Sequence, residues 1–499
     1  LTVLVHPAAL YDISFQLSYV SVWVLALALQ RERPPDELPS PTIGLVGRTL
    51  YWLKESVRLT AWVTLATMPL VACYFNQVSW MGLFANLLMV PFVGFLLLPM
   101  SLLSAVWVIV SQSSTLPFAG AIELLGQAVM TSTQWLAGLP GAEWYVAAPT
   151  VPTMLLFYVL GWAMLTDRPV HASPMVQRAM AVGMACLIVW WLWSPRPFSQ
   201  EGQVRVTFLD VGQGDSAVIE LPRREVVLID GGATYERFDM GRGVVAPFLW
   251  NRGIRTIDHV IATHPQLDHA GGLAWILAHF HVEQVWTNGV SRSEEFYRKI
   301  ERALASRHLS ATVAEQGRQM LEDGDCAMAV LNPPPGRDAS SVGKQPSLNN
   351  LSVVTELTCG RRRMLFTGDI EREGLARMAQ AGHLRHIDLL KVPHHGALSS
   401  LDRGWLNTVQ PEIAVVSAGR RNPYGHPAGD VIAAYQSVET QLWRTDQDGA
   451  VWADLDLAQQ SLTMHSTREW QLQPALMTIP QWTIEQENLS RLWRRWNWN

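Results

Sequence analysis

Residues 263–272, THPQLDHAGG, contain the side chains best suited to chemistry, His264, Asp268 and His269. The strand-like run HVIA precedes this segment, so the imidazoles emerge where a strand ends and a loop begins. Neutral imidazole and carboxylate are usual ligands for zinc, manganese or iron. Because one such segment supplies only two or three ligands, a metal site needs further ligands from elsewhere in the chain.

The same pattern recurs through the second half of the chain, where a strand-like run repeatedly ends in a glycine-rich loop that carries Asp or His. Strand ends on one edge of a sheet can converge on a single site. Many such residues together favour a metal centre over isolated capping residues. The residues at these positions are Asp210, Asp230, His264, Asp268, His269, Asp369, His394, His395 and His426.

The elements that position these residues form a series of strands and turns. We expect strands at VRVTFLDVG, SAVIEL, REVVLIDGG, IDHVIAT, SVVTEL, RMLFTGD, IDLLKVPHHG and PEIAVVSAG, and helices at residues 272–281 and 371–381. SVVTEL and RMLFTGD should pair with one another. The segment TDQDGAVWADLDL predicts a β-hairpin that turns at Asp448 and Gly449.

Charge is distributed unevenly along the 499 residues. Charged side chains occupy 16 of the first 200 positions and 65 of the remaining 299, whereas a soluble domain usually carries about 25%. The first part is therefore membrane-like and the second soluble. The net charge of −5 provides no general attraction to nucleic acid. The chain begins at Leu1 within an apolar stretch, which we interpret as a fragment of a longer protein.

Apolar segments suited to membrane helices recur through the first half. The third segment is too long for one straight helix, and Pro91 and Pro99 should kink or break it. Asn86 and Pro91 fit a kink between packed helices and a pore-lining element equally well. We expect spans near residues 13–29, 59–75, 81–110, 118–136, 151–165 and 179–193.

Basic residues in the connecting segments predict the orientation of these spans. Residues 30–58 hold five Lys or Arg and residues 166–178 hold two, whereas residues 137–150 hold none. The first two segments are therefore expected in the cytoplasm and the third outside it. With six spans, the soluble half lies outside the cytoplasm, and a seventh span hidden in residues 81–110 would reverse this assignment.

Four cysteines are scattered along the chain. Cys73 and Cys186 lie in apolar spans. Cys326 and Cys359 lie in the soluble half and could pair in an oxidising compartment, although we expect two buried free thiols.

The soluble half resembles the metallo-β-lactamase superfamily, which shares a His-x-(His/Asp)-x-Asp-His signature and an αββα sandwich with a metal site on one edge. More narrowly, five further motifs resemble the soluble domain of the ComEC family of competence membrane proteins. FQLSY and NLLMVP resemble the transmembrane competence domain of the same family, and the similarity covers most of residues 1–460. The five motifs are DVGQGDS, LIDGG, FTGD, KVPHHG and YGHP, at residues 210–216, 228–232, 366–369, 391–396 and 424–427.

This resemblance implies an all-α polytopic transmembrane domain followed by an α/β metallo-β-lactamase-like domain, in a multi-pass protein of the bacterial inner membrane. The tail, rich in Trp and Arg, fits an amphipathic helix on the membrane surface or a disordered terminus. The expected parts are the C-terminal part of the channel domain at 1–193, a linker at 194–203, the metallo-β-lactamase-like domain at 204–467 and the tail at 468–499.

The resemblance also implies DNA uptake for natural transformation, with metal-dependent hydrolysis of the strand that is not imported. The cofactor would be one or two divalent ions, zinc or manganese. The implied partners are DNA, with a single strand in the channel, the lipid membrane, other competence proteins and, in a homo-oligomer, further copies of the chain. The expected metal ligands are His264, Asp268, His269, Asp369, His394 and His426, and the expected catalytic residues are Asp268, His395, Asp210 and Asp215.

Three further residues have expected roles near this site. Asp230 should orient a ligand histidine. Arg420 and Arg421 either meet phosphates or are simply solvated.

Gln266 departs from the family pattern, in which this position usually carries a carboxylate. Glutamine is a poor ligand for a transition metal, so either one metal suffices, another group compensates, or the hydrolase is weak or inactive. Three functions therefore remain open. They are DNA uptake with strand degradation, transport with a non-catalytic sandwich that guides DNA, and membrane-anchored hydrolysis of another phosphodiester, such as a cell-envelope component.

Overall fold

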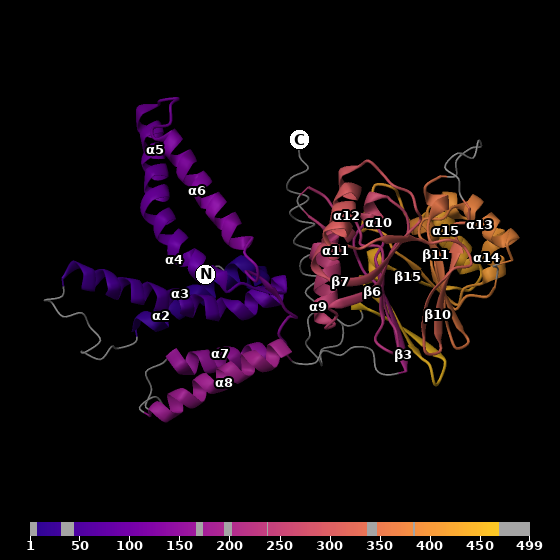
Figure 1. Cartoon of the computed structure of the whole chain (residues 1–499), viewed down its shortest axis with the longest axis horizontal. Helices are drawn as coiled ribbons and strands as arrows, with labels where there is room; N and C mark the ends of the chain where they lie inside the picture. The colour runs from indigo at the N-terminus through magenta and orange to yellow at the C-terminus, as the bar shows by residue number, and fades with distance from the viewer. Residues whose placement is uncertain are drawn as a thin grey trace. The chain divides into compact units, whose positions relative to one another are not determined.

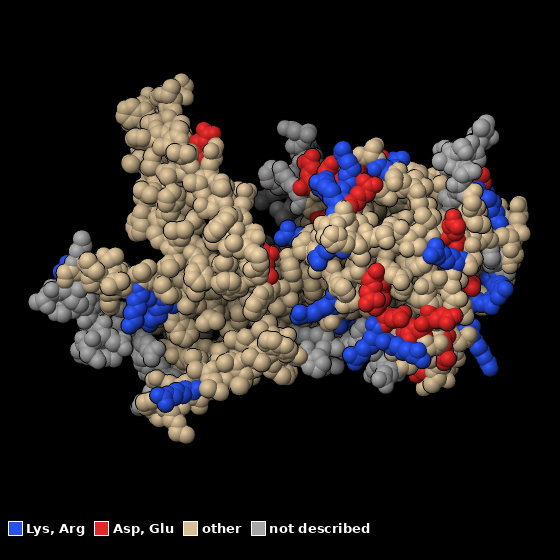
Figure 2. All heavy atoms as spheres, viewed as in Figure 1, with Lys and Arg blue, Asp and Glu red and all other residues tan. Residues whose placement is uncertain are grey.

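The computed structural model describes residues 7–30, 44–165, 173–193, 202–236, 238–336, 347–382 and 385–468. The chain divides into two compact units, Leu1–Ser194 and Pro195–Asn499, here termed the helical unit and the sheet unit (Figure 1). Most of the expected linker and almost all of the expected tail lie outside the described residues. On the face shown in Figure 2, charged side chains gather on the sheet unit and are sparse on the helical unit.

The helical unit has a helix at each of the six predicted spans. Among the described residues, Val46–Phe75, Met81–Ser111 and Pro174–Trp193 are long and apolar enough to cross a membrane, and Ile13–Leu29 and Val151–Leu165 are shorter apolar helices. The elements are η1 (Pro7–Tyr11), α2 (Ile13–Gln30), α3 (Leu45–Phe75), β1 (Gln77–Val78), α4 (Met81–Phe92), η3 (Val93–Leu97), α5 (Leu98–Ser111), α6 (Ala119–Ala137), β2 (Trp144–Tyr145), α7 (Val151–Leu165) and α8 (Pro174–Trp193).

Two features of this unit bear on the predictions. Of the kink or break expected in the third span, the break is absent at Pro91, because a π-helical turn at Val93–Leu97 joins α4 to α5 and the backbone at both junctions stays right-handed helical. In addition, α3 begins at Leu45 and not near residue 59. Arg58 therefore belongs to the helix, where it donates to Glu55 one turn earlier. Both residue types are good helix formers, which explains the longer helix.

The sheet unit consists of two β-sheets flanked by helices. The strands are β3 (Gln203–Phe208), β4 (Ala217–Glu220), β5 (Val226–Ile229), β6 (Thr256–Ala262), β7 (His281–Thr287), β8 (Ala311–Val313), β9 (Gln319–Asp323), β10 (Cys326–Asn332), β11 (Val354–Cys359), β12 (Arg362–Phe366), β13 (Leu389–Lys391), β14 (Ile413–Val416), β15 (Gln441–Arg444), β16 (Val451–Asp456) and β17 (Ser461–Ser466). The helices are η5 (Gly241–Val245), α9 (Ala246–Asn251), α10 (Leu267–Ala270), α11 (Leu273–His279), α12 (Glu295–Ser306), η6 (Asn349–Leu351), α13 (Arg372–Gln380), η7 (Pro393–Gly396), η8 (Leu398–Ser400), α14 (Arg403–Val409), α15 (Gly429–Ser437) and α16 (Thr445–Asp448).

The two sheets pack face to face. One has the order β17-β16-β3-β4-β5-β6-β7-β8, and the other has the order β15-β14-β13-β12-β11-β10-β9. Alternation along β12 shows the packing, because Met364 and Phe366 join the core between the sheets whereas Leu365 joins the core beneath the outer helices. Helices α13, α14 and α15 cover that outer face, and α9, α11 and α12 lie at the other side of the unit (Figure 1). The expected αββα sandwich is confirmed.

The predicted hairpin at residues 445–457 is wrong. β15 pairs in parallel with β14 in one sheet, whereas β16 pairs with β3 and β17 in the other. The short helix α16 carries the chain between the sheets, and Asp448 within it accepts a hydrogen bond from the backbone N–H of Arg444 at 2.9 Å. The Asp448 and Gly449 pair therefore turns the chain from one sheet to the other.

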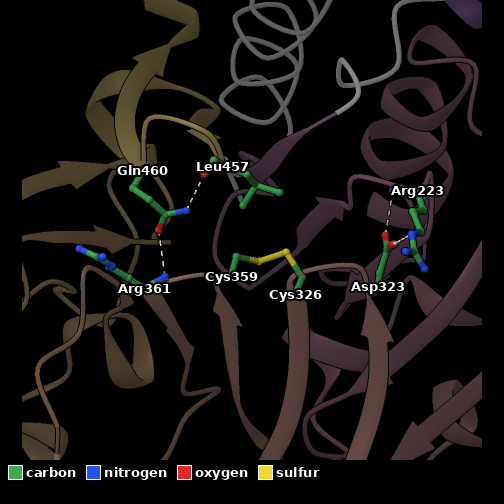
Figure 3. Close-up of a disulfide and its surroundings, with 7 residues drawn as sticks. All are labelled: Arg223, Asp323, Cys326, Cys359, Arg361, Leu457 and Gln460. Carbon is green, nitrogen blue, oxygen red and sulfur yellow. Dashed lines mark hydrogen bonds and ion pairs between the residues drawn. A yellow bond between two sulfur atoms is a disulfide. The ribbon is translucent and has the colours of Figure 1, made fainter.

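Cys326 and Cys359 form a disulfide between β10 and β11, contrary to the free thiols expected (Figure 3). Both residues are buried, and they face each other directly in the antiparallel register. The sequence allowed this pairing in an oxidising compartment, but the separation of 33 residues between the two cysteines gave no sign that they lie opposite one another. Disulfides persist in oxidising compartments, so this bond bears on the location of the sheet unit.

Candidate metal centre

Loops that follow several strands meet at one edge of the sandwich. β5 leads into Asp230, β6 into His264, β12 into Asp369 and β13 into His395. β5 and β6 are parallel, as are β12 and β13, so the carboxyl ends of these strands point to the same edge. The loop between β3 and β4 adds Asp215.

Four buried residues form the centre of this edge, and one potential ligand atom from each lies within 4.8 Å of the others. We term these residues the ligand cluster: Asp215, His269, Asp369 and His395. His269 Nε2 lies 3.1 Å from Asp369 Oδ2, and His395 Nε2 lies 3.3 Å from the same oxygen. Two imidazole nitrogens therefore converge on one carboxylate oxygen.

The tautomer of each histidine in the ligand cluster follows from its other ring nitrogen. His269 Nδ1 lies 2.7 Å from Asp230 Oδ2, and His395 Nδ1 lies 2.9 Å from the carbonyl oxygen of Ser417. Because an ionised carboxylate and a carbonyl only accept hydrogen bonds, Nδ1 of each ring carries the proton. Each Nε2 atom then faces the cluster, where neither has a hydrogen-bond partner. Buried ring nitrogens that face two carboxylates fit positive charge at the centre, either as a metal ion or as protons on the rings.

The electrostatics agree with this arrangement. Burial alone would lower the pKa of His395, but the charges of Asp369 and Asp215 outweigh it and raise the pKa to about 9. Burial also lowers the pKa of His269, but the charges of Asp369 and Asp230 outweigh this effect and raise the pKa well above its ordinary value. Without a metal, the cluster thus binds protons where a cation would lie.

Asp230 holds His269 in place. Its carboxylate accepts hydrogen bonds from the backbone N–H of Thr263 at 2.8 Å and from the Thr263 hydroxyl at 2.7 Å, in addition to His269 Nδ1. The Asp230 side chain is fully buried, so these three bonds fix its orientation. A carboxylate behind a histidine in this way sets the ring orientation and raises its basicity as a ligand.

Lys391 is a residue of this site that sequence reasoning missed. Its Nζ forms an ion pair with Asp215 and lies 3.6 Å from Asp369 Oδ1. It also donates to the carbonyl oxygen of Gly368 at 3.0 Å. Burial lowers the pKa of Lys391, but Asp215 and Asp369 raise it overall, so the ammonium stays charged and offsets the carboxylates. The available signal was a lysine in the KVPHHG motif, between an apolar strand and two histidines.

Asp268 and His264 flank the ligand cluster. Asp268 Oδ2 lies 3.6 Å from His395 Nε2. Burial would raise the pKa of Asp268, but the close approach of His395 and the charge of His269 lower it to about 2. His264 is buried, and burial followed by the charge of His269 lowers its pKa to about 4, so its ring is neutral. The Nε2 atom of His264 has no hydrogen-bond partner and is available as a ligand.

Three other residues predicted from the sequence lie outside the ligand cluster. Asp210 Oδ1 accepts a hydrogen bond from the backbone N–H of Gly212 at 3.2 Å and shapes the β3–β4 loop. His394 Nε2 lies 3.7 Å from Asp369 Oδ2. The ring of His426 lies 5.7 Å from that of His394, centroid to centroid.

Gly214 explains why Asp215, and not Asp210, enters the cluster. Its φ of +145° suits glycine, and a Cβ there would lie 2.3 Å from the backbone oxygen of Asp268. This close approach lets the backbone N–H of Asp215 donate to the same oxygen at 3.1 Å. The loop is thereby fixed to α10, which carries Asp268 and His269.

Gln266 points to a second amide. Its Nε2 donates to Asn349 Oδ1 at 2.6 Å, and Asn349 Nδ2 lies 3.4 Å from His394 Nε2. We term Gln266, Asn349 and His394 the amide side of the centre. The amide nitrogens of Gln266 and Asn349 both have partners within this side, unlike the Nε2 atoms of the ligand cluster.

Matches to known families cover both units. Residues 1–169 match the model of the family described as Competence protein, and residues 209–308 match the model of the Metallo-beta-lactamase superfamily. Together with the sandwich fold, these matches describe a region similar to competence proteins followed by a metallo-β-lactamase-like domain. Both regions are similar to the ComEC family of competence proteins.

Curated relatives extend along most of the chain. It is 28% identical over 460 residues to ComE operon protein 3 of Bacillus subtilis, covering 90% of this chain and 56% of that protein. It is 28% identical over 389 residues to Competence protein ComA of Neisseria gonorrhoeae, covering 77% of this chain and 48% of that protein. The chain thus spans about half the length of the curated relatives it matches.

Among solved structures, Zn(2+)-bound PqqB from Methylobacterium extorquens is similar to this chain with a TM-score of 0.31 and 13% identity. That similarity covers 51% of this chain and 99% of that one.

Proposed function

We propose that this chain is part of an inner-membrane protein that takes up DNA for natural transformation, and that its sheet unit hydrolyses phosphodiester bonds of the strand that is not imported. Similarity to competence proteins supports the part played in DNA uptake. The ligand cluster is the observation that carries the hydrolysis, because its unpartnered Nε2 atoms and carboxylates are buried together at one edge of the sandwich.

The donor set fits a divalent ion, zinc or manganese. Two imidazole nitrogens and two carboxylates suit either metal. We propose one ion, held by His269, Asp369 and His395 and completed by Asp215 or Asp268. When bound, such an ion lowers the pKa of a coordinated water and polarises a phosphoryl oxygen.

The residues around the proposed ion orient its ligands, offset the carboxylate charge and provide a proton acceptor. Asp230 and the carbonyl group of Ser417 keep the protons of both ligand histidines on Nδ1, so that each Nε2 stays a donor to the metal. Lys391 neutralises part of the carboxylate charge. Asp268 is ionised, and its side chain is 31% exposed, so it can accept a proton from an attacking water.

A non-catalytic sheet unit that only guides DNA is the second candidate function. Gln266 favours it, because this amide stands where the family usually carries a carboxylate and donates to Asn349. This function predicts that no divalent ion is needed at the ligand cluster.

We also propose that the sheet unit lies on the outer side of the inner membrane. The disulfide supports this location, because an oxidising compartment preserves such bonds. The loop charges support it as well. A test is a reporter enzyme that is active only in the cytoplasm, fused after residue 468. The fusion should be inactive, and full activity would contradict the orientation.

The function is tested with the purified chain in lipid nanodiscs. Metal content is measured, and labelled single-stranded DNA, duplex DNA and a glycerophosphodiester are offered as substrates. We expect about one ion per chain and metal-dependent cleavage of DNA, which Asp369→Asn abolishes. Gln266→Ala is the matched control and should retain both. Metal-free protein that cleaves nothing would favour the guiding function, and cleavage of the glycerophosphodiester alone would favour the third hypothesis, hydrolysis of another phosphodiester.

A further inference from the structure

We propose that two exposed tyrosines beside the metal centre, Tyr235 and Tyr424, stack on the bases of a single-stranded DNA substrate. The proposal rests on the proposed function, because it assigns a substrate form to the same site. It begins from the distribution of exposed apolar side chains over the sheet unit.

Exposed apolar side chains gather around the metal centre. Among the described residues of the sheet unit, the large apolar side chains that are well exposed number five, and four of them belong to loops or short helices of this edge. Tyr235 follows β5, Leu267 precedes Asp268 in α10, Leu398 follows η7, and Tyr424 precedes His426. The fifth, Val313, lies on the edge strand β8. We term the four exposed residues at this edge, Tyr235, Leu267, Leu398 and Tyr424, the rim. A substrate that binds the rim therefore has apolar surfaces as well as a phosphodiester.

Tyr424 is positioned by the loop between β14 and α15. Its ring is 67% exposed and stacks on the ring of His426, with 5.8 Å between the centroids and 27° between the planes. Asn422 secures the loop, since its side chain donates to the carbonyl oxygen of His426 at 2.6 Å and accepts from the His426 N–H at 3.0 Å. The ring of His426 in turn lies 6.4 Å from that of His395. One face of an aromatic ring is thus held at a fixed place beside the ligand cluster.

Tyr235 is positioned by a turn that packs on α10. Its backbone N–H donates to the carbonyl oxygen of Phe238 at 2.7 Å, and the side chain is 54% exposed. Gly271 permits the contact, because a Cβ there would lie 2.6 Å from the backbone nitrogen of Thr234. The loop of Tyr235 thus contacts the end of α10, the helix that carries Asp268 and His269, and Tyr424 approaches His395 through His426. Both tyrosines therefore belong to the edge of the sandwich that carries the metal centre.

Nucleobases are the apolar surfaces that this rim fits. Exposed tyrosine rings next to positive charge are the usual means of binding single-stranded nucleic acid, because every base offers a flat π face. Arg420 and Arg421 are exposed in the same loop as Tyr424 and supply positive charge for the phosphates. In a duplex the bases are paired and stacked on one another, so they cannot reach the rings. The rim thereby favours the single strand over the duplex.

The test measures binding apart from cleavage. The full chain in nanodiscs, with a chelator present, is titrated with fluorescent oligothymidylate, an abasic chain of equal length and a duplex. Tyr424→Ala and Tyr235→Ala should each weaken oligothymidylate binding by about tenfold or more, which matches the binding free energy that one stacked base contributes. Binding of the abasic chain and the duplex should stay the same. Tyr→Phe at each position keeps the ring and should bind as wild type, and Val313→Ala controls for loss of an exposed apolar side chain elsewhere.

Two results would overturn the proposal. In the first, the affinity for oligothymidylate is unchanged in both alanine variants. In the second, both variants lose affinity for oligothymidylate and for the abasic chain equally, which would indicate damage to the loops and not loss of base stacking. Cleavage with metal present separates this proposal from the proposed function. Tyrosine-dependent binding by a chain that cleaves nothing supports stacking and contradicts hydrolysis, whereas cleavage without tyrosine-dependent binding supports hydrolysis and contradicts stacking.

Discussion

The two sides of the metal centre are both built from loops that carry polar side chains, but these side chains have different hydrogen-bond partners. On the ligand cluster, Asp230 and a backbone carbonyl group keep the protons of His269 and His395 on Nδ1, so each Nε2 faces the cluster and can take a metal ion or a proton. On the amide side, Gln266 donates to Asn349, which in turn lies within hydrogen-bond distance of His394. The first side requires a cation or protons between its groups, and the second requires neither. Buried ring nitrogens without a hydrogen-bond partner, more than polar residues as such, therefore indicate where an ion would bind.

Among substitutions on the two sides, the largest effect on metal binding is expected at Asp369 in the ligand cluster. Asp369→Asn removes the charge on which both Nε2 atoms converge, so the bound ion should be lost and metal-dependent hydrolysis should fall to background. Metal content per chain, measured by elemental analysis, checks this. Gln266→Ala on the amide side should keep the ion. Full metal content in Asp369→Asn would show that the ligand cluster does not hold it.

The next effect concerns Asp230, which touches the centre only through His269. Asp230→Asn offers an amide N–H to His269 Nδ1 and favours the wrong tautomer, so metal affinity should weaken by about 10- to 100-fold. A competition titration against a chromophoric chelator measures it. Asp454→Asn is the matched control, because Asp454 pairs with Arg205 outside the centre. Equal affinities in wild type and Asp230→Asn would remove the orienting role.

Metal affinity should also depend on pH. The metal binds the deprotonated rings, whereas in the metal-free protein His395 stays protonated below its pKa of about 9 and the pKa of His269 is also raised. Binding below pH 9 must therefore displace protons, and apparent affinity should rise with pH by up to about tenfold per unit for each proton released. The contribution of His395 to this rise should level off above pH 9. Chelator competition at pH 6 to 9 checks this, and a flat profile would contradict the protonated cluster.

The smallest effect is expected on the amide side. Gln266→Asp combined with Asn349→His replaces the two carboxamides by metal ligands near His394, and the ion count should rise from one to two with the first site kept. Gln266→Asp alone leaves Asn349 in place and should stay at one ion. Wild-type protein that already binds two ions would show that the amides do not prevent a second site.

Much of the architecture follows from local sequence features. The division into a membrane-like and a soluble half was visible in the charge distribution, because hydropathy is a property of neighbouring residues. His269, Asp369 and His395 were predicted at strand ends, because a strand and its glycine-rich loop lie within a few residues. The αββα fold came from the family resemblance, and the two sheets agree with it.

Contacts between distant loops were decided only by the tertiary structure. The sequence places Asp210 and Asp215 in one motif, and only the close approach of Gly214 to α10 selects Asp215. Gln266 meets Asn349 across 83 residues of chain, and Cys326 meets Cys359 through the register of β10 and β11. Strand order and register bring these pairs together, and both arise from packing two sheets around one core, which no local pattern of residues encodes.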